Sequence, residues 1–413
     1  MKILLSAYWC APNYGSEQAT GWNFAEQLSE KGHEVIVITQ EAKEAVEQRF
    51  NKSDYPNLTF IYFSLPLWIK KVIFRGTGPL AHLYNFIWQV YAYFFLKAFL
   101  KGRDIDLIHH ITLGVFRTPV FLGLLGKPFI FGPVGGGETS TSQLQKNLPI
   151  KFRIKEKLRH LINLSVLFNP LCWLTFHTAQ LILVKTSDNL TYIPRRYHYK
   201  CKVSLEVGIS LQMIESIKKK DIINRDGLKI LFAGRLEYWK GIHLAIKCYA
   251  QVLKQHSNVT YTIIGSGTDE AWIKNVAIQA QVYDRINWLP RVSQKELFNM
   301  YKQYDILLFP SLHDSSGYIA IEALAHGLPV ICLDLGGPKE IVDNNCGYII
   351  NTFAQSEKKV VDNLAEAVNS LIANPNNLSI LRHNAIEKSK NYTWSQVVGK
   401  TYDLIEQRIY KLH

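Results

Sequence analysis

The sequence predicts an α/β protein built from two doubly wound domains. Short apolar runs alternate with segments of helical length along most of the 413 residues. Strands that are apolar on both faces are typical of parallel sheets covered by helices, and two separate series of them argue for two such sheets. The expected strands of the first series are 3–7, 34–39, 59–63, 106–110, 128–132 and 181–185. Those of the second series are 229–233, 260–264, 285–289, 306–310 and 329–333.

The domain boundaries follow from a charged, polar interval at 203–227, which is expected to link the two sheets. We predict an N-terminal Rossmann-like domain over residues 1–205 and a C-terminal Rossmann-like domain over residues 206–390. Residues 391–413 carry regularly spaced apolar side chains and are predicted to form a separate amphipathic helix.

The composition excludes several classes of protein. With 47% hydrophobic and 12% aromatic residues the chain can bury a sizeable core, which excludes a disordered or collagen-like chain. Forty-seven Lys and Arg against 34 Asp and Glu give a formal charge of +13, which indicates anionic partners. Nucleic acid, an acidic membrane and phosphorylated small molecules all qualify. The basic residues are dispersed and form no recognised nucleic-acid motif, so no nucleic acid is expected as a partner.

The chain is expected to act in the cytoplasm. Its six cysteines are scattered without a C-x-x-C pair, which favours reduced thiols over a disulfide framework. The apolar start of the chain stops at Tyr8 and Trp9, before an apolar region of signal-peptide length is reached. It is interpreted as the first strand of a domain.

Two segments indicate contact with a membrane surface. No Asp, Glu, Lys or Arg lies between Arg75 and Lys97, but polar residues and glycines interrupt the stretch, so a buried or interfacial helix is favoured over a membrane span. Residues 151–159 hold five basic residues and one acid and precede an apolar run. They predict a surface for anionic lipid, with an ordinary solvated helix face as the alternative.

The segment from Pro310 to Pro329 is the most informative part of the sequence. A strand is expected to end at Pro310, and a small polar loop leads into a helix that ends near His326. Backbone amides at such a loop can hold an anion. Glu322 is a lone carboxylate on an otherwise apolar helix and requires hydrogen-bonding partners, for which sugar hydroxyls or internal backbone groups are the alternatives. Asp314 could contact a ligand or cap the helix.

Two further glycine-containing loops follow expected strands of the second domain. Gly234 and Arg235 precede Lys240 and Gly241, and two cations on such a loop can clamp a diphosphate, although each cation alone would be taken as solvated. Gly265 begins a second tight turn between a strand and a helix.

The first domain offers candidate residues at the carboxyl edge of its sheet. Gly15 and Ser16 follow the first strand and could present amides to a phosphate, but the pattern is not G-x-G-x-x-G, so a nicotinamide cofactor is not expected. His109 and His110 end a strand at the same edge. One of them is expected to face a cleft as an acid–base or hydroxyl-orienting group, and no metal site is expected because no third ligand accompanies them.

With these motifs the chain resembles the retaining glycosyltransferases of family 4, which have the GT-B fold, two Rossmann-like domains facing each other across a cleft. The segment from Asp314 to Glu322 is similar to the E-x(7)-E motif of that family, and the loop from Gly234 to Gly241 is similar to its diphosphate-binding loop. Gly132-Pro-Val-Gly-Gly-Gly-Glu138 and His109-His110-Ile-Thr112 are similar to runs in several bacterial members. The resemblance covers nearly the whole chain.

The resemblance implies a role for each motif. Arg235 and Lys240 would neutralise the donor diphosphate, Glu322 would bind the ribose, and the first domain would bind the acceptor. The last helix would cross back to the N-terminal domain. The donor-binding residues implied are Gly15, Ser16, Gly234, Arg235, Lys240, Gly265, Val292, Asp314, Ser315, Ser316, Gly317, Tyr318 and Glu322. The catalytic residues expected are Asp314, Glu322, Arg235, Lys240, His109 and His110.

The expected activity is therefore retaining transfer of a sugar from a nucleoside-diphosphate sugar, of the UDP or GDP type, to a glycan or polyprenyl-linked acceptor in cell-surface polysaccharide synthesis. No cofactor and no metal are expected. The location expected is the cytoplasm, extending to the inner face of the plasma membrane. A departure from the family is Asp314, where a glutamate is usual. The alternatives are a GT-B sugar-nucleotide epimerase or phosphorylase and, less favoured, a basic nucleic-acid-binding protein.

Overall fold

The computed structural model describes residues 1–12, 15, 17–41, 43–47, 50–51, 53–69, 79–215 and 227–410. The chain divides into two compact units. Unit 1 comprises Met1–Gly137, Leu161–Val207 and Trp394–His413, and unit 2 comprises Glu138–His160 and Gly208–Thr393. The predicted domain boundaries placed residues 138–160 in the first domain, whereas in the structure they pack with unit 2. The physical reason is aromatic packing, because the Phe152 ring stacks on Tyr238 with centroids 4.3 Å apart.

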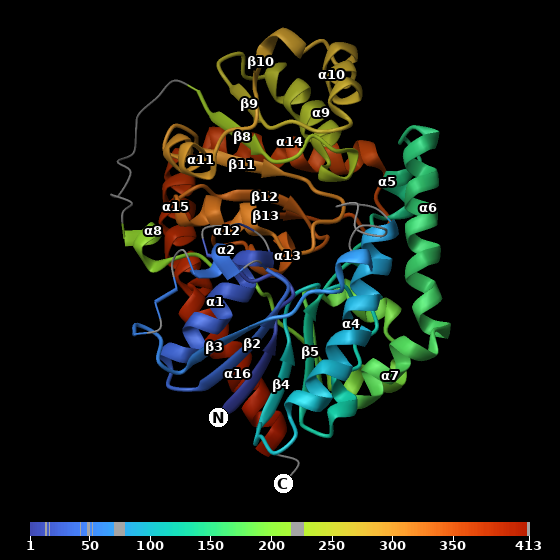
Figure 1. The fold of residues 1–413 in the computed structure, drawn as a ribbon. Helices are drawn as coiled ribbons and strands as arrows, with labels where there is room; N and C mark the ends of the chain where they lie inside the picture. Colours follow the sequence, from blue (N-terminus) through green and yellow to red (C-terminus); the bar gives the residue numbers. More distant parts are fainter. Residues whose placement is uncertain are drawn as a thin grey trace. The chain divides into compact units, whose positions relative to one another are not determined.

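Unit 1 is a Rossmann-like domain (Figure 1). In its described part, seven parallel strands are ordered β3-β2-β1-β4-β5-β6-β7, so the direction of winding reverses between β1 and β4. The strands are β1 (Lys2–Ser6), β2 (Glu34–Thr39), β3 (Leu58–Tyr62), β4 (Leu107–His110), β5 (Phe129–Val134), β6 (Leu181–Val184) and β7 (Cys201–Val203). The central strands are buried on both faces, which is why the corresponding runs in the sequence are mostly apolar.

The helices of unit 1 lie against this sheet. They are α1 (Glu17–Glu30), α2 (Lys43–Glu47), α4 (Pro79–Phe99), α7 (Pro170–Thr178) and α16 (Trp394–Tyr410), with 3₁₀ turns at Leu122–Leu125, Val166–Phe168, Ser187–Tyr192 and Arg195–Lys200. α16 packs beside α1, as Figure 1 shows. α4 buries Trp88 and Leu96 and exposes Phe94 on its other side. No helix in the described parts of the chain is long and apolar enough to cross a membrane.

Unit 2 repeats the Rossmann-like plan with a smaller sheet. Its described residues form six parallel strands in the order β10-β9-β8-β11-β12-β13. The strands are β8 (Lys229–Ala233), β9 (Thr260–Ile264), β10 (Ile286–Leu289), β11 (Ile306–Phe309), β12 (Val330–Leu333) and β13 (Gly347–Ile350). The sequence analysis did not predict β7 or β13, which are strands of three and four residues.

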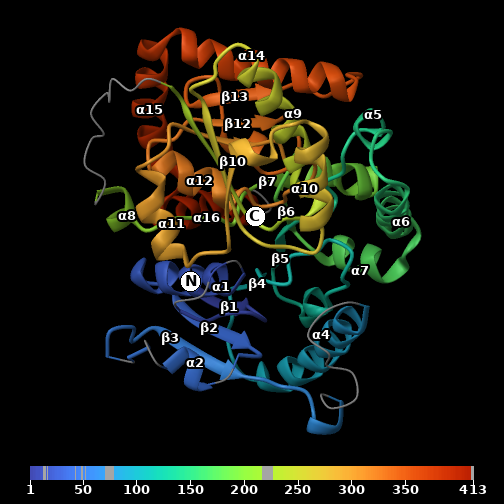
Figure 2. The same cartoon turned by 90° about the horizontal axis from the view of Figure 1, so that it is seen from above.

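The helices of unit 2 follow its strands in alternation. They are α5 (Ser142–Gln145), α6 (Ile150–Ser165, whose last turns belong to unit 1), α8 (Leu211–Glu215), α9 (Ile242–Leu253), α10 (Glu270–Gln279), α11 (Gln294–Tyr301), α12 (Tyr318–Ala325), α13 (Pro338–Ile341), α14 (Glu357–Ala373) and α15 (Pro375–Ser389). Shorter 3₁₀ turns lie at η5 (Tyr238–Lys240), η6 (Tyr283–Arg285) and η7 (Lys390–Tyr392). α9 and α14 pack side by side (Figure 2).

Gly241 fixes how closely two loops of unit 2 approach. Its φ is +71°, and a Cβ built on it would lie 1.7 Å from the carbonyl oxygen of Pro310. We expect Gly241→Ala to lower the free energy of unfolding by about 3 kcal/mol or more, because the loop must move as well as adopt a left-handed conformation. Chemical denaturation measures this loss. Gly32→Ala is the matched control, since Gly32 has φ +83° and no atom within 4 Å of its Cβ position. Its cost is about 1–2 kcal/mol, and equal losses in the two variants would contradict the steric account.

Candidate active site

The candidate residues of unit 2 meet at the carboxyl edge of its sheet, where the loops after β8, β9, β11 and β12 contact one another. The Gly234 amide donates to the Ile264 carbonyl oxygen at 3.0 Å, and the Leu312 amide donates to the Trp239 carbonyl oxygen at 2.8 Å. The Gly337 amide donates to the Asp314 carbonyl oxygen at 2.6 Å. Because β9, β8, β11 and β12 are neighbours, this edge is where a doubly wound sheet binds ligands.

Lys240 and Asp314 form a largely buried ion pair. The Lys240 Nζ donates to Asp314 Oδ2, and the two side chains are 12% and 13% exposed. The pair lies across the loops after β8 and β11. The Lys240 ammonium also lies 4.4 Å from the centroid of the Trp239 ring. The sequence analysis singled out both residues, and the structure brings them into direct contact.

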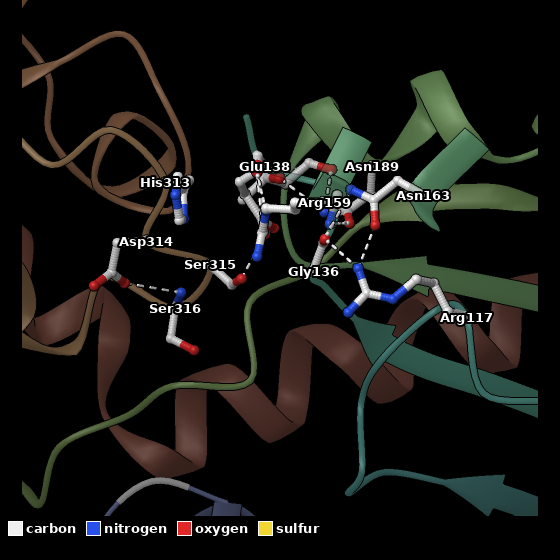
Figure 3. Close-up of polar contacts among 12 residues, drawn as sticks. Arg117, Gly136, Glu138, Arg159, Asn163, Asn189, His313, Asp314, Ser315 and Ser316 are labelled. Atoms are coloured by element: carbon white, nitrogen blue, oxygen red, sulfur yellow. Dashed lines mark hydrogen bonds and ion pairs between the residues drawn. The ribbon is translucent and has the colours of Figure 1, made fainter. Parts of the chain in front are cut away.

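The second oxygen of Asp314 organises its own loop. Oδ1 accepts a hydrogen bond from the Ser316 amide at 3.2 Å (Figure 3). It also accepts one from the Gly317 amide at 2.8 Å. Burial alone would raise the pKa of the Asp314 carboxyl, but the Lys240 charge and these amides hold it below its usual value. These bonds close the loop before α12 and do not cap the helix, since its N-cap residue is Gly317 and no side chain caps it. An aspartate fits because its short side chain reaches amides two and three residues ahead.

Arg235 has a different environment. Its side chain is 66% exposed and pairs with Glu237 at 3.2 Å. Its guanidinium lies 5.1 Å from the Trp239 ring centroid, so both candidate cations flank one indole. The exposed guanidinium is accessible to a ligand, whereas Lys240 is held in place.

Glu322 is buried on α12, and two side chains supply its hydrogen bonds. Gln294 Nε2 donates to Oε1 at 2.8 Å, and the Tyr301 hydroxyl donates to Oε2 at 3.4 Å. Burial raises the pKa of the Glu322 carboxyl to about 7, although both hydrogen bonds oppose the rise. The partners are side chains, not the backbone groups that the sequence analysis considered as the alternative. A carboxyl with this pKa changes its charge near neutral pH, which marks it as a candidate functional group.

Other predicted donor-binding residues lie beside these groups. Gly265 follows β9, and a Cβ on it would lie 1.9 Å from the Gly234 carbonyl oxygen. Val292 is half-buried in the loop before α11, two residues before Gln294, the partner of Glu322. Ser315 lies in the loop after β11, and Tyr318 is the first residue of α12.

Glu138 and Arg159 were not predicted as site residues, but Glu138 contacts the loop after β11 and Arg159 contacts Glu138. Ser315 Oγ donates to Glu138 Oε2 at 2.5 Å, and Arg159 Nη2 donates to the Glu138 carbonyl oxygen at 3.0 Å (Figure 3). The Glu138 side chain is fully buried. Its position at the end of the Gly132–Glu138 run was the signal in the sequence, since a carboxylate after three glycines follows an expected strand.

A second group that the sequence analysis missed centres on Glu156 of α6. Glu156 Oε1 accepts from the Tyr238 hydroxyl at 2.8 Å and from His313 Nε2 at 2.9 Å. The His313 ring stacks on Trp239, with centroids 5.2 Å apart and planes 11° apart. Glu156 is the one acid in the basic run 151–159, and that isolation was the available signal.

Both histidines at the end of β4 are buried within unit 1. His109 Nε2 lies 2.7 Å from the Gly132 carbonyl oxygen and Nδ1 lies 3.0 Å from the Tyr402 hydroxyl. His110 Nδ1 lies 3.1 Å from Ser6 Oγ. Both rings are buried, and burial lowers the pKa of His109 to about 4 and that of His110 to about 3. Both rings are neutral at pH 7, and the acid–base or hydroxyl-orienting role stays a prediction.

Gly15 and Ser16 are the two residues of unit 1 that were predicted to bind the donor. Gly15 is exposed, with no atom within 4 Å of its Cβ position, and Ser16 lies outside the described residues.

Side chains hold the turn after β5 through its backbone. The Gly136 carbonyl oxygen accepts from Arg117 Nη1 at 3.1 Å and from Asn163 Nδ2 at 3.2 Å (Figure 3). Within the described part of the chain, no three His, Cys, Asp or Glu side chains group as metal ligands.

Comparison with protein families identifies the region that carries this site. Residues 213–392 match the model of the glycosyl transferases group 1. The match includes Arg235, Lys240, Asp314 and Glu322. It covers somewhat less than half of the chain.

Several curated proteins are distantly similar to this chain. An uncharacterized glycosyltransferase of Methanocaldococcus jannaschii is 28% identical over 202 residues, which are 48% of this chain and 50% of the relative. A glycogen synthase of Mycobacterium tuberculosis is 31% identical over 36% of this chain and 34% of its own length. This chain thus spans half or less of these relatives. The gpi3 subunit of a phosphatidylinositol N-acetylglucosaminyltransferase of Schizosaccharomyces pombe is 24% identical over 95% of this chain and 78% of its own length.

Solved structures share the fold over nearly the whole chain. WaaG, a glycosyltransferase involved in lipopolysaccharide biosynthesis, has a TM-score of 0.60 at 17% identity and covers 98% of this chain and 99% of its own. HepE of Anabaena, solved with UDP, has a TM-score of 0.60 at 14% identity and covers 98% of this chain and 100% of its own. These similarities establish two Rossmann-like domains of the GT-B type.

Proposed function

We propose that this chain, whose residues 213–392 match the model of the glycosyl transferases group 1, is a retaining glycosyltransferase of the family 4 type. It transfers a sugar from a nucleoside-diphosphate sugar to a glycan or lipid-linked acceptor in cell-surface polysaccharide synthesis. The observation that carries the proposal is the Lys240–Asp314 pair beside Arg235, at the carboxyl edge of the unit 2 sheet. Two cations at that edge are what a departing diphosphate requires.

The proposed mechanism is electrostatic. As the bond between the sugar C1 and the phosphate oxygen breaks, negative charge grows on the diphosphate, and Lys240 and Arg235 stabilise it. Lys240 is already fixed by Asp314, so little reorganisation is needed when the charge develops. The acceptor oxygen bonds to C1 on the same face, and its proton passes to the released phosphate. Neither step uses a nucleophile of the protein.

The nucleotide is proposed to bind through Glu322. An ionised carboxylate accepts two hydrogen bonds from the ribose hydroxyls, and Gln294 and Tyr301 hold it in position. UDP is favoured over GDP as the nucleotide because HepE was solved with UDP and with UDP-glucose. The amide of Gly317 is bound by Asp314 and therefore supports the loop more than it offers a free donor.

An activity assay tests the proposal directly. The purified chain is incubated with UDP-, GDP- and ADP-sugars and with lipid-linked acceptors, and released nucleoside diphosphate and glycosylated product are quantified. We expect release of diphosphate with one base and a product that keeps the anomeric configuration of the donor. Arg235→Ala should lower the rate by about 10–100-fold, because one of two cations is lost. Inversion would refute retention, and an epimerised donor without transfer would refute the transferase.

We further propose that the enzyme acts in the cytoplasm at the inner face of the plasma membrane, through α6. Ile150, Ile154 and Leu158 are spaced one turn apart on this helix and are 72%, 59% and 56% exposed. Exposed lysines and an arginine at 151, 153, 155 and 157 lie between them. An exposed apolar stripe with basic neighbours fits the headgroup region of an anionic bilayer.

Vesicle binding checks the membrane contact. The double variant Ile154→Glu/Leu158→Glu is expected to lose at least about tenfold in affinity for vesicles of phosphatidylglycerol and phosphatidylcholine in equal parts, because two apolar side chains no longer insert. Ile278→Glu is the control, since Ile278 is 57% exposed on α10. Equal binding by the double variant and the wild type would contradict the proposed contact.

A further inference from the structure

In unit 2, side chains of the loop after β8 contact side chains of the loop after β11. In the loop after β8, Tyr238, Trp239 and Lys240 follow one another, and in the loop after β11, His313 precedes Asp314. Lys240 bonds to Asp314, and the Trp239 ring stacks on His313. Trp239 and Lys240 of the first loop thus each contact a residue of the second loop.

Glu156 connects this arrangement from a third element, α6. One carboxylate oxygen, Oε1, receives hydrogen bonds from Tyr238 of the first loop and His313 of the second, at 2.8 and 2.9 Å. Glu156 is 1% exposed, and its other oxygen, Oε2, is buried and has no hydrogen-bond partner among the described residues. A buried carboxylate with one oxygen unsatisfied is costly, so packing alone does not account for a glutamate at this position.

The surroundings of Glu156 keep its carboxyl in the charged form. Burial would raise the pKa of the Glu156 carboxyl, but the hydrogen bond and charge of His313, the Tyr238 hydroxyl and the nearby Arg159 charge lower it below its usual value. The carboxylate is therefore ionised at neutral pH and attracts both donors. Its two partners are direct chain neighbours of Trp239 and Asp314, the groups that contact Lys240.

We infer that Glu156 is a positioning residue for the Lys240–Asp314 pair. By holding Tyr238 and His313 on one oxygen, it fixes the separation of the two loops and so the place of the Lys240 ammonium against the donor diphosphate. This inference rests on the proposed function and adds to it a residue outside both motifs. Glu156 acts through Lys240 and does not itself touch the donor.

The test compares diphosphate affinity, turnover and thermal stability in matched variants. Glu156→Leu removes both hydrogen bonds and is expected to weaken UDP or GDP binding, and to slow transfer, by about tenfold. Glu156→Gln keeps an acceptor oxygen in the same place and should restore most of that loss. In a Lys240→Ala background, Glu156→Leu should cause no further loss of affinity, because the effect passes through Lys240.

Glu357→Leu is the matched control. Glu357 is also a buried glutamate of unit 2, bonded through one oxygen to Lys247, while its Oε2 has no partner among the described residues. The Glu357→Leu variant should lower thermal stability as Glu156→Leu does, and it should leave diphosphate affinity and turnover unchanged. If Glu156→Leu fails to fold, His313→Asn removes half of the contact and should weaken affinity by about threefold.

The outcomes separate the inference from the function on which it rests. If wild type binds no diphosphate, the proposed function fails. If wild type binds and the Glu156 or His313 variants bind equally well, the function stands and the positioning role is refuted. Equal losses in the Lys240→Ala background and in wild type would also refute it, because Glu156 would then act independently of Lys240.

Discussion

Lys240→Met is expected to lower the rate of sugar transfer by about 10²–10³-fold, the effect of removing one preorganised group that stabilises developing charge. The same change should lower the free energy of unfolding of unit 2 by about 3 kcal/mol. The reason is that Asp314, whose side chain is 13% exposed, would keep its charge without its partner. Steady-state kinetics and urea denaturation measure the two effects separately.

The double variant Lys240→Met/Asp314→Asn distinguishes stability from catalysis. It removes both charges and keeps an acceptor oxygen for the Ser316 and Gly317 amides, so stability should return to within about 1 kcal/mol of wild type while transfer stays low. Arg235→Ala should change stability by less than about 0.5 kcal/mol, because its side chain is 66% exposed. Recovery of transfer in the double variant would show that Lys240 is structural and not part of the donor site.

Glu322→Gln is expected to stabilise the protein above pH 7 while weakening nucleotide binding. The pKa of the Glu322 carboxyl is about 7 in the folded protein, against 4.5 for an ordinary glutamate. Below pH 4.5 the Glu322 carboxyl is protonated in both the folded and the unfolded protein. Between pH 4.5 and pH 7 it is protonated to a greater extent in the folded protein than in the unfolded protein. Stability therefore falls as pH rises through this window. At pH 8 the glutamine variant, which cannot ionise, should gain up to about 3 kcal/mol.

Calorimetry and denaturation at several pH values check this expectation. The stability difference between Glu322→Gln and wild type should disappear below pH 4.5. Nucleoside diphosphate should bind the variant about 10–100-fold more weakly, because ribose hydroxyls lose a charged acceptor. A stability gain that is independent of pH, or unaltered nucleotide affinity, would contradict the assigned role.

The sequence was sufficient to predict both sheets, since their strands are covered on two faces and contain almost no polar residues. The strands that escaped prediction are different in kind. Cys201–Val203 is a three-residue edge strand with two exposed positions, and Gly347–Ile350 begins with a glycine directly after a turn. Neither carries enough apolar residues to form a recognisable run.

Candidate site residues could be predicted from the sequence when they belong to a motif with a recognisable spacing. They could not be predicted when the site depends on contacts between segments that are far apart in the sequence. Arg235, Lys240, Asp314 and Glu322 stand in recognisable loops, but no local pattern shows that Lys240 pairs with Asp314, because the two are 74 positions apart. Glu156 lies in a basic run that suggested only a lipid-facing surface. Its inward position depends on α6 packing against Tyr238, which belongs to a loop far along the chain.

His109 and His110 are residues that the sequence singled out and that the structure buries. His109 and His110 stand at the end of a strand, where functional groups are common, and that place suggested that one imidazole faces a cleft. The structure instead gives each ring an internal partner, Tyr402 for His109 and Ser6 for His110. Tyr402 belongs to α16, so this burial depends on a helix almost 300 residues away, which no local pattern could reveal.

The most direct test of the donor site is a calorimetric titration of the purified chain with UDP, GDP and ADP in two buffers of different ionisation enthalpy. The account predicts that one diphosphate binds, that binding strengthens from pH 6 to pH 8, and that protons are released at pH 7 as Glu322 becomes ionised against the ribose. Lys240→Met should bind it far more weakly. Absence of binding by all three diphosphates would contradict the account, and binding without proton release would remove Glu322 from the site.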